Sequence, residues 1–154
     1  MEQVVLMCGA AGSGKSTHAR RLAAEGYAVL SFDAEAWARG YRSHPVTEDQ
    51  RRAVQDALRE QLVRLVAAGH PVVVDSSFWS RAARDEYRAL LAPLGVEPVV
   101  HYLDTRREVV LARLAARRGT GPDDVPVPPA RALAYLDGFE PPTPEEGPLR
   151  VVAG

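Results

Sequence analysis

The sequence predicts a three-layer α/β/α domain built on a five-stranded parallel sheet. Short, nearly all-apolar runs alternate along the chain with longer helical patterns. Strands without polar alternation are typical of a parallel sheet covered by helices on both faces. A length of 154 residues and an apolar content of 46% fit one compact domain. We therefore expect a single domain over residues 1–154.

Five runs are expected to form the strands, because each is short, rich in Val or Leu, and bounded by turn-forming or polar residues. They are Gln3–Cys8, Ala28–Phe32, Pro71–Asp75, Val96–Leu103 and Leu149–Ala153. Their spacing leaves the order of the strands in the sheet open.

Helical patterns fill the intervals between the strands. The longest runs from Thr47 to about Ala68, with Thr47 and Gln50 spaced as a capping box. A second capping box is expected at Thr105 and Glu108, opening a helix that stops at Gly119. The other helical patterns follow Gly14, cover Ala34–Tyr41, begin near Ser80, and end near Asp137.

Composition excludes several classes of function. Nineteen basic and 20 acidic residues give a net charge of −1, so the whole molecule does not attract nucleic acid or anionic lipid at long range. No apolar run approaches the roughly 18 residues of a spanning helix, and the first residues lack a basic secretory start. We expect a cytoplasmic protein without a membrane partner. One cysteine and four scattered histidines predict neither a disulfide nor a zinc cluster.

A phosphate-binding loop is predicted between the first strand and the first helix. The segment GAAGSGKS at 9–16 fits the pattern G-x-x-x-x-G-K-[ST] in the strand-to-helix context that the motif requires. Backbone N–H groups of such a loop surround the phosphates of a nucleoside triphosphate. Lys15, the only lysine, is expected to bridge the β- and γ-phosphates, and the Ser16 hydroxyl to bind Mg²⁺. The other expected nucleotide contacts are Gly9, Gly12, Ser13, Gly14 and Thr17.

Asp33 directly follows the second strand. In open α/β sheets the site lies at the carboxyl ends of the strands, so this carboxylate is expected to face the phosphates. We interpret Asp33 as the base that orients an acceptor hydroxyl and takes its proton. The alternative is that Asp33 only caps the helix that follows.

Asp75 ends the third strand, after three valines. An apolar strand that ends in a carboxylate is typical of a residue that reaches Mg²⁺ or holds the hydroxyl of Ser16. We predict a role near metal or acceptor, with structural capping of the loop as the alternative.

A basic segment is predicted to act as a lid over about residues 106–130. Five arginines against Glu108 between Thr105 and Arg118 give this segment a charge of +4. Arg113 and Arg117 lie four residues apart and are expected to share a helix face, from which both could stabilise charge on the transferring phosphoryl group. The alternative is a solvated basic face that pairs with acidic groups of the tail.

Four aromatic residues flank the predicted acceptor side: Trp37, Tyr41, Phe78 and Trp79. They could wall a substrate pocket or fill the core. His44 is a distant candidate for substrate contact.

These motifs resemble the small P-loop kinases of the polynucleotide-kinase, zeta-toxin and chloramphenicol-phosphotransferase type. The resemblance rests on the loop at 9–17, Asp33, the V-V-D at 73–75, the A-R-D-E at 83–86, the R-x-x-x-R at 113–117 and the F-E-x-P at 139–142. It implies a P-loop NTPase fold with an adenylate-kinase-like sheet, ATP as donor, Mg²⁺, Asp33 as base, and Arg113 and Arg117 as lid arginines. Polynucleotide kinases of this type tend to carry an arginine three residues after the base, where this chain has Ala36.

Three functions remain open at this point. The first is a phosphotransferase that acts on a hydroxyl of a small molecule, nucleoside or antibiotic. The second is a 5′-hydroxyl polynucleotide kinase, which Ala36 and the charge near zero disfavour. The third is a nucleotide-binding switch or accessory protein that transfers no phosphate. The sequence gives no expectation for the oligomeric state.

Overall fold

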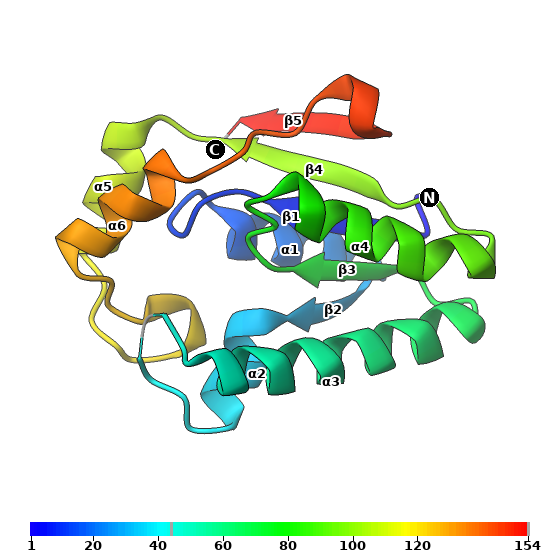
Figure 1. The fold of residues 1–154 in the computed structure, drawn as a ribbon, viewed down its shortest axis with the longest axis horizontal. Helices are drawn as coiled ribbons and strands as arrows, with labels where there is room; N and C mark the ends of the chain where they lie inside the picture. The colour runs from blue at the N-terminus through cyan, green and yellow to red at the C-terminus, as the bar shows by residue number, and fades with distance from the viewer. Residues whose placement is uncertain (44, 154) are drawn as a thin grey trace.

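The fold is that of the predicted three-layer domain (Figure 1). A computed structural model describes residues 1–43 and 45–153, so that His44 lies outside the described residues. Neighbouring strands are parallel, in the order β2-β3-β1-β4-β5. The strands are β1 (Val4–Cys8), β2 (Ala28–Ser31), β3 (Val72–Asp75), β4 (Val99–Asp104) and β5 (Leu149–Ala153). All five predicted strands are confirmed, with small shifts at their ends.

Two apolar cores lie on opposite faces of the sheet, because side chains alternate along each strand. Val4 and Leu6 of β1 pack toward α3 (Glu48–Ala67) and α4 (Arg81–Leu91). Val5 and Met7 pack toward α1 (Lys15–Ala24) on the other face. Burial on both faces explains why the central strands are continuous apolar runs.

Of the two predicted capping boxes, the structure confirms one. Thr47 and Gln50 form the expected capping box of α3, and the Ser80 hydroxyl accepts from the Ala83 N–H at the start of α4. The capping box predicted at Thr105 and Glu108 is wrong. The Thr105 hydroxyl instead donates to the carbonyl oxygen of Ser13, at 2.6 Å.

The helix after that strand is also shorter than predicted. This helix, α5 (Arg107–Ala115), ends four residues before Gly119. Its last turn closes with bonds from the Ala116 N–H to the Ala112 carbonyl oxygen and from the Arg117 N–H to the Leu114 carbonyl oxygen. The remaining helices are α2 (Phe32–Ala38) and α6 (Pro129–Asp137). In the described part of the chain, no helix has both the length and the apolar character needed to cross a membrane.

The carboxyl ends of the three adjacent strands β2, β3 and β1 meet at one edge of the sheet. In the strand register, Asp75 lies beside both Ser31 and Met7. The residues that follow these strand ends are thereby brought together, and α5 and α6 stand beyond the same edge (Figure 1). This edge is where the predicted site residues gather.

A buried arginine ties the loop after β3 to the C-terminal segment. Arg84 of α4 is fully buried and forms two bonds to the Glu146 carboxylate, at 2.9 and 2.8 Å. Its other terminal nitrogen donates to the carbonyl oxygens of Phe78 and Glu140. These bonds hold the pKa of Glu146 down at about 2, so the carboxylate stays charged in the folded protein. The Arg84 contacts also fix Phe78, which has an unusual positive φ of 46°.

Replacement of Arg84 by alanine is expected to lower the free energy of unfolding by about 3 kcal/mol. The change leaves a buried carboxylate with two remaining partners, Arg88 and the Thr143 N–H, each at 3.2 Å, so the cost lies at the lower end for a broken buried pair. Urea denaturation measures it. Arg81→Ala removes an exposed arginine of the same helix and is the control, with an expected effect within about 0.5 kcal/mol. A loss of stability below about 1 kcal/mol for Arg84→Ala would contradict a stabilising role for the contacts of Arg84 with Glu146, Phe78 and Glu140.

Candidate active site

The phosphate-binding loop ends at a helix N-terminus without a side-chain cap, while its Gly9 and Ser13 N–H groups donate to the carbonyl oxygens of Ser77 and Ala10. It runs from the end of β1 to the first residue of α1, Lys15, and its last residue, Gly14, has φ of 102° and no capping side chain. No acidic residue stands in the first turn of α1. Free N–H groups and the positive end of the helix dipole therefore point out of the loop, as phosphate binding requires.

Two further glycines of the loop are required by packing. A Cβ atom at Gly9 would lie 2.5 Å from the Ser13 hydroxyl. At Gly12, which has φ of 81°, a Cβ would press on the Val110 carbonyl oxygen and on Leu114 of α5, both at 3.1 Å. The loop is thus packed against α5, and its shape depends on residues without side chains.

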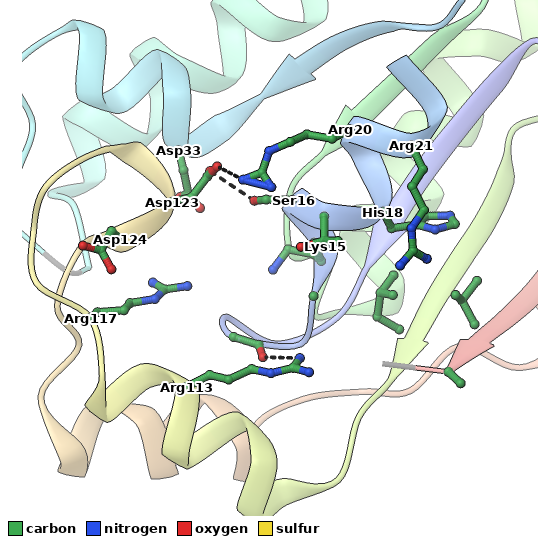
Figure 2. A pocket seen from close by; sticks show the side chains of 16 residues that line it. Lys15, Ser16, His18, Arg20, Arg21, Asp33, Arg113, Arg117, Asp123 and Asp124 are labelled. Carbon is green, nitrogen blue, oxygen red and sulfur yellow. Dashed lines mark hydrogen bonds and ion pairs between the residues drawn. The ribbon is translucent and has the colours of Figure 1, made fainter. Parts of the chain in front are cut away.

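A cavity of about 450 Å³ lies over this loop and gathers most of the predicted site residues (Figure 2). It is lined by Lys15, Ser16 and Thr17 from α1, by Asp33 from α2, and by both lid candidates, Arg113 and Arg117. Residues that the sequence analysis did not single out also line it: Arg20, Arg21, His18, Asp123 and Asp124. Five cationic side chains, Lys15 and four arginines, facing one cavity provide a site for a polyanion.

Lys15 is placed at the base of the cavity. Its ammonium group donates to the carbonyl oxygen of Ala10 at 3.2 Å and forms no ion pair among the described residues. A cation with only a neutral partner can exchange that contact for phosphate oxygens at low cost.

Asp33 lies in the first turn of α2 and is exposed to the cavity. The cap of α2 is Ser31, whose hydroxyl accepts from the Ala34 N–H at 3.0 Å. The helix therefore does not use Asp33 as its cap, which was the alternative to a base.

Asp75 lies below the cavity floor, at 7% exposure. Burial raises its pKa to about 6, and the negative charges of Asp33 and Asp123 act in the same direction. Lys15 and the Ser16 hydroxyl oppose this shift. The carboxyl group is thus in a place where an added cation would stabilise its charged form.

The oxygen donors near Ser16 fit a magnesium ion that is shared with phosphates. Among the described residues, no group of three or more His, Cys, Asp or Glu could hold a metal by itself. A hydroxyl with nearby carboxylates is nevertheless the donor chemistry that Mg²⁺ prefers, and Mg²⁺ commonly takes its remaining ligands from water and substrate phosphates. Ser16 and Asp75 are the residues that would hold it.

The two lid arginines reach the cavity from different segments. Arg113 lies on α5 and donates to the Gly12 carbonyl oxygen at 3.2 Å. Arg117 lies beyond the end of α5 and donates to the Val125 carbonyl oxygen at 3.1 Å, so the shared helix face predicted for them is wrong. Arg107, of the same basic segment, forms an exposed ion pair with Asp137 at the end of α6, at 2.6 Å.

The four aromatic residues divide between core and surface. Phe78 is buried in the core, edge-on to Tyr87. Tyr41 packs against the same core, and Trp37 is covered by the Arg42 guanidinium, 3.5 Å from its ring centre. Trp79 is 53% exposed.

Asp123 is the main residue that sequence reasoning missed. Its carboxylate accepts from the Ser16 hydroxyl and from Arg20, each at 3.1 Å (Figure 2). The only available signal was an acidic pair, Asp123 and Asp124, inside the Gly- and Pro-rich segment at 119–129.

Comparison with known proteins identifies the family and the fold. The family model AAA_33, described as an AAA domain, matches residues 4–142. A search of curated proteins by sequence finds no significant match. A gluconokinase from Sinorhizobium meliloti is 25% identical with a TM-score of 0.68, over 100% of this chain and 86% of that one.

Two other solved structures share the fold at lower identity. A candidate kinase from Chloroflexus aurantiacus is 18% identical with a TM-score of 0.81, over 99% of this chain and 88% of that one. Kti12 from Chaetomium thermophilum, in complex with ADP-AlF3, is 20% identical with a TM-score of 0.74, over 97% of this chain and 88% of that one. The fold is thus that of P-loop NTPases of the kinase type, as the sequence predicts.

Proposed function

The chain belongs to the AAA_33 family of AAA domains, and from this premise we propose that it is an ATP-dependent kinase that phosphorylates a hydroxyl group of a small molecule. One observation carries the proposal: the carboxylate of Asp33, the phosphate-binding loop and two lid arginines line the same cavity. A nucleotide-binding switch needs the loop, but it does not need a carboxylate placed opposite the phosphates.

In the proposed mechanism, the loop N–H groups and Lys15 bind the phosphates of ATP and hold the γ-phosphoryl group in place. Asp33 accepts a hydrogen bond from the acceptor hydroxyl, aligns its oxygen with the γ-phosphorus, and takes the proton as the new P–O bond forms and the bond to the β-γ bridging oxygen breaks. Arg113 and Arg117 stabilise the charge on the transferring group. Mg²⁺, held through Ser16 and Asp75, supplies charge neutralisation on the β- and γ-phosphates when bound.

The segment at about 106–130 is proposed as the lid. It brings Arg113 and Arg117 to the cavity that contains the phosphate-binding loop, and its closure would exclude water. A kinase needs this exclusion because water is a competing acceptor.

Three observations support a small acceptor over a 5′-hydroxyl polynucleotide. Ala36 is buried in the core, so the position where polynucleotide kinases tend to carry an arginine cannot offer a cation. Arg39 and Arg42, the nearest arginines along the chain, engage Glu35 and Trp37. The gluconokinase, at 25% identity, acts on a small polyhydroxylated substrate by its name. We place this activity in the cytoplasm, as expected from the sequence.

The direct experiment is transfer of label from γ-labelled ATP in the presence of Mg²⁺. Sugars and sugar acids, nucleosides, aminocyclitol and other hydroxylated antibiotics, and short 5′-hydroxyl oligonucleotides are offered in parallel. The expected result is labelling of a small molecule. Labelling of the oligonucleotide alone would favour the polynucleotide kinase, and binding of ATP without any transfer would favour the switch.

Arg117→Ala is expected to lower the transfer rate about 10²-fold or more, while ATP affinity changes less. The guanidinium is proposed to act on charge that develops in transfer, whereas most contacts to bound ATP come from the loop. Rates under saturating ATP and nucleotide titration separate the two effects. Arg118→Ala, at a neighbouring arginine that does not line the cavity, is the matched control. If the transfer rate and the ATP affinity fell by the same factor, Arg117 would be assigned to binding of the nucleotide and not to stabilisation of the transferring phosphoryl group.

A further inference from the structure

Asp123 connects the lid to the phosphate-binding loop across 107 positions of the chain. It lies in the short turn η2 (Pro122–Asp124). One carboxylate oxygen accepts from the Ser16 hydroxyl and the other from Arg20, both at 3.1 Å (Figure 2). The mechanism proposed above gives this residue no task.

Hydrogen bonds of Asp124 stabilise the loop at 118–124, and the neighbouring Asp123 side chain faces α1. Asp124 accepts from the Arg118 N–H, the Thr120 N–H and the Thr120 hydroxyl, at 3.0, 3.2 and 2.8 Å. The Gly119 N–H in turn donates to the Asp124 carbonyl oxygen at 2.7 Å. The two adjacent aspartates therefore differ: Asp124 shapes the loop, and Asp123 makes its contacts outside it.

The direction of the hydrogen bond fixes the orientation of the Ser16 hydroxyl. An ionised carboxylate can only accept, and in the structure the Ser16 hydroxyl donates its hydrogen bond to Asp123 at 3.1 Å. The lone pairs of the Ser16 oxygen then remain available to a cation. A group that orients a metal ligand in this way typically changes metal affinity by about 10–100-fold when it is removed.

Resting on the kinase function proposed above, we propose that Asp123 is a positioning residue of the magnesium–nucleotide site, carried by the lid. When the lid is closed, the Asp123 carboxylate accepts a hydrogen bond from the Ser16 hydroxyl, which leaves the lone pairs of the Ser16 oxygen directed toward the metal. Lid closure and binding of the magnesium–nucleotide complex are then coupled, and each strengthens the other by the same factor.

The test is nucleotide affinity with and without metal, measured by calorimetry with ADP in excess Mg²⁺ and in excess EDTA. The ratio of the two affinities is the gain from magnesium. In Asp123→Ala this gain is expected to fall about 10–100-fold, while affinity in EDTA stays near that of the wild type. Asp123→Asn retains a hydrogen-bond acceptor without the charge, and its magnesium gain is expected to lie between those of the wild type and Asp123→Ala. Because the Asp123 contacts are exposed, folding is expected to be unchanged, and thermal unfolding checks this.

Two controls separate the Ser16 bond from other effects. Arg20→Gln removes the ion pair but leaves the Ser16 bond, and Asp137→Asn breaks the exposed pair with Arg107 away from the cavity. Asp137→Asn is expected to leave the magnesium gain unchanged. Arg20 lines the cavity, so Arg20→Gln is expected to weaken nucleotide binding in both solutions, and to lower the magnesium gain, their ratio, by no more than about 3-fold. Ser16→Ala combined with Asp123→Ala is expected to lose no more than Ser16→Ala alone.

The outcomes are distinguishable. If the wild type binds no nucleotide, the proposed function fails, and the inference with it. If the wild type shows a magnesium gain that Asp123→Ala retains, the inference alone is overturned. Tighter binding by Asp123→Ala in both solutions would also overturn it, because Asp123 would then be a competitor of the phosphates at Ser16.

Discussion

Asp33→Asn is expected to lower phosphoryl transfer by about 10²–10⁴-fold while nucleotide affinity stays near that of the wild type. The amide keeps the size of the carboxylate and can still accept a hydrogen bond from the acceptor hydroxyl, but it cannot take the proton. Asp33 faces the cavity from α2, outside the phosphate-binding loop, so its loss should not disturb bound phosphates. Transfer rates at saturating ATP and a calorimetric nucleotide titration measure the two quantities.

Glu35→Gln is the matched control for Asp33→Asn. Glu35 lies on the same helix and is engaged with Gln61 at 3.3 Å and Arg39 at 3.6 Å, so its replacement perturbs α2 without touching the cavity. We expect the control to transfer phosphate within about 3-fold of the wild type. A large loss in both variants would indicate a displaced α2, and full activity in Asp33→Asn would remove the base assignment.

The fold was predictable where local patterns determine it. The five strands are readable because each is buried on both faces and therefore apolar throughout. The start of α3 is readable because Thr47 and Gln50 cap it within four residues. Thr105 was misread for the opposite reason: its hydroxyl bonds to Ser13, 92 positions away, and no local spacing carries that contact.

The candidate site shows the same division between local and distant contacts. The phosphate-binding loop is a single continuous segment, and its glycines are explained by the close approach of Leu114 and the Ser13 hydroxyl. Asp123, in contrast, contacts Ser16 from 107 positions away, and no local pattern in the sequence indicates that contact. The roles of Asp33, Asp75 and the lid arginines stay predictions, since their geometry supports a role without testing it.

Charge in the cavity links these residues. Asp33 and Asp123 raise the pKa of the buried Asp75, whereas Lys15 lowers it. Repulsion among carboxylates next to a loop built for phosphates is relieved when a divalent cation and its phosphate ligands enter together. This pattern of charge supports the proposed binding of Mg²⁺ together with the nucleotide.

Lys15→Ala is expected to lower phosphoryl transfer by about 10²–10³-fold and to weaken nucleotide binding. The ammonium group is the one compact cation of the site, and its partner among the residues that the structure describes is the neutral carbonyl oxygen of Ala10 at 3.2 Å. Lys15→Arg keeps the charge on a larger, planar group that does not replace a point cation between two phosphates. It is expected to bind nucleotide better than Lys15→Ala and still to transfer slowly.

The single lysine makes the binding step directly observable. Reductive methylation with a carbon-13 label marks one ε-amine in this chain, since Lys15 is the only lysine. Addition of ATP is expected to shift the ε-methyl signal in a saturable way, because phosphate oxygens replace the Ala10 contact. Two results would show that the phosphates bind elsewhere: an unchanged ε-methyl signal in a protein that still binds ATP, or wild-type transfer by Lys15→Ala. The proposed roles of Ser16 and the lid arginines would then fail as well, because they assume phosphates beside Lys15.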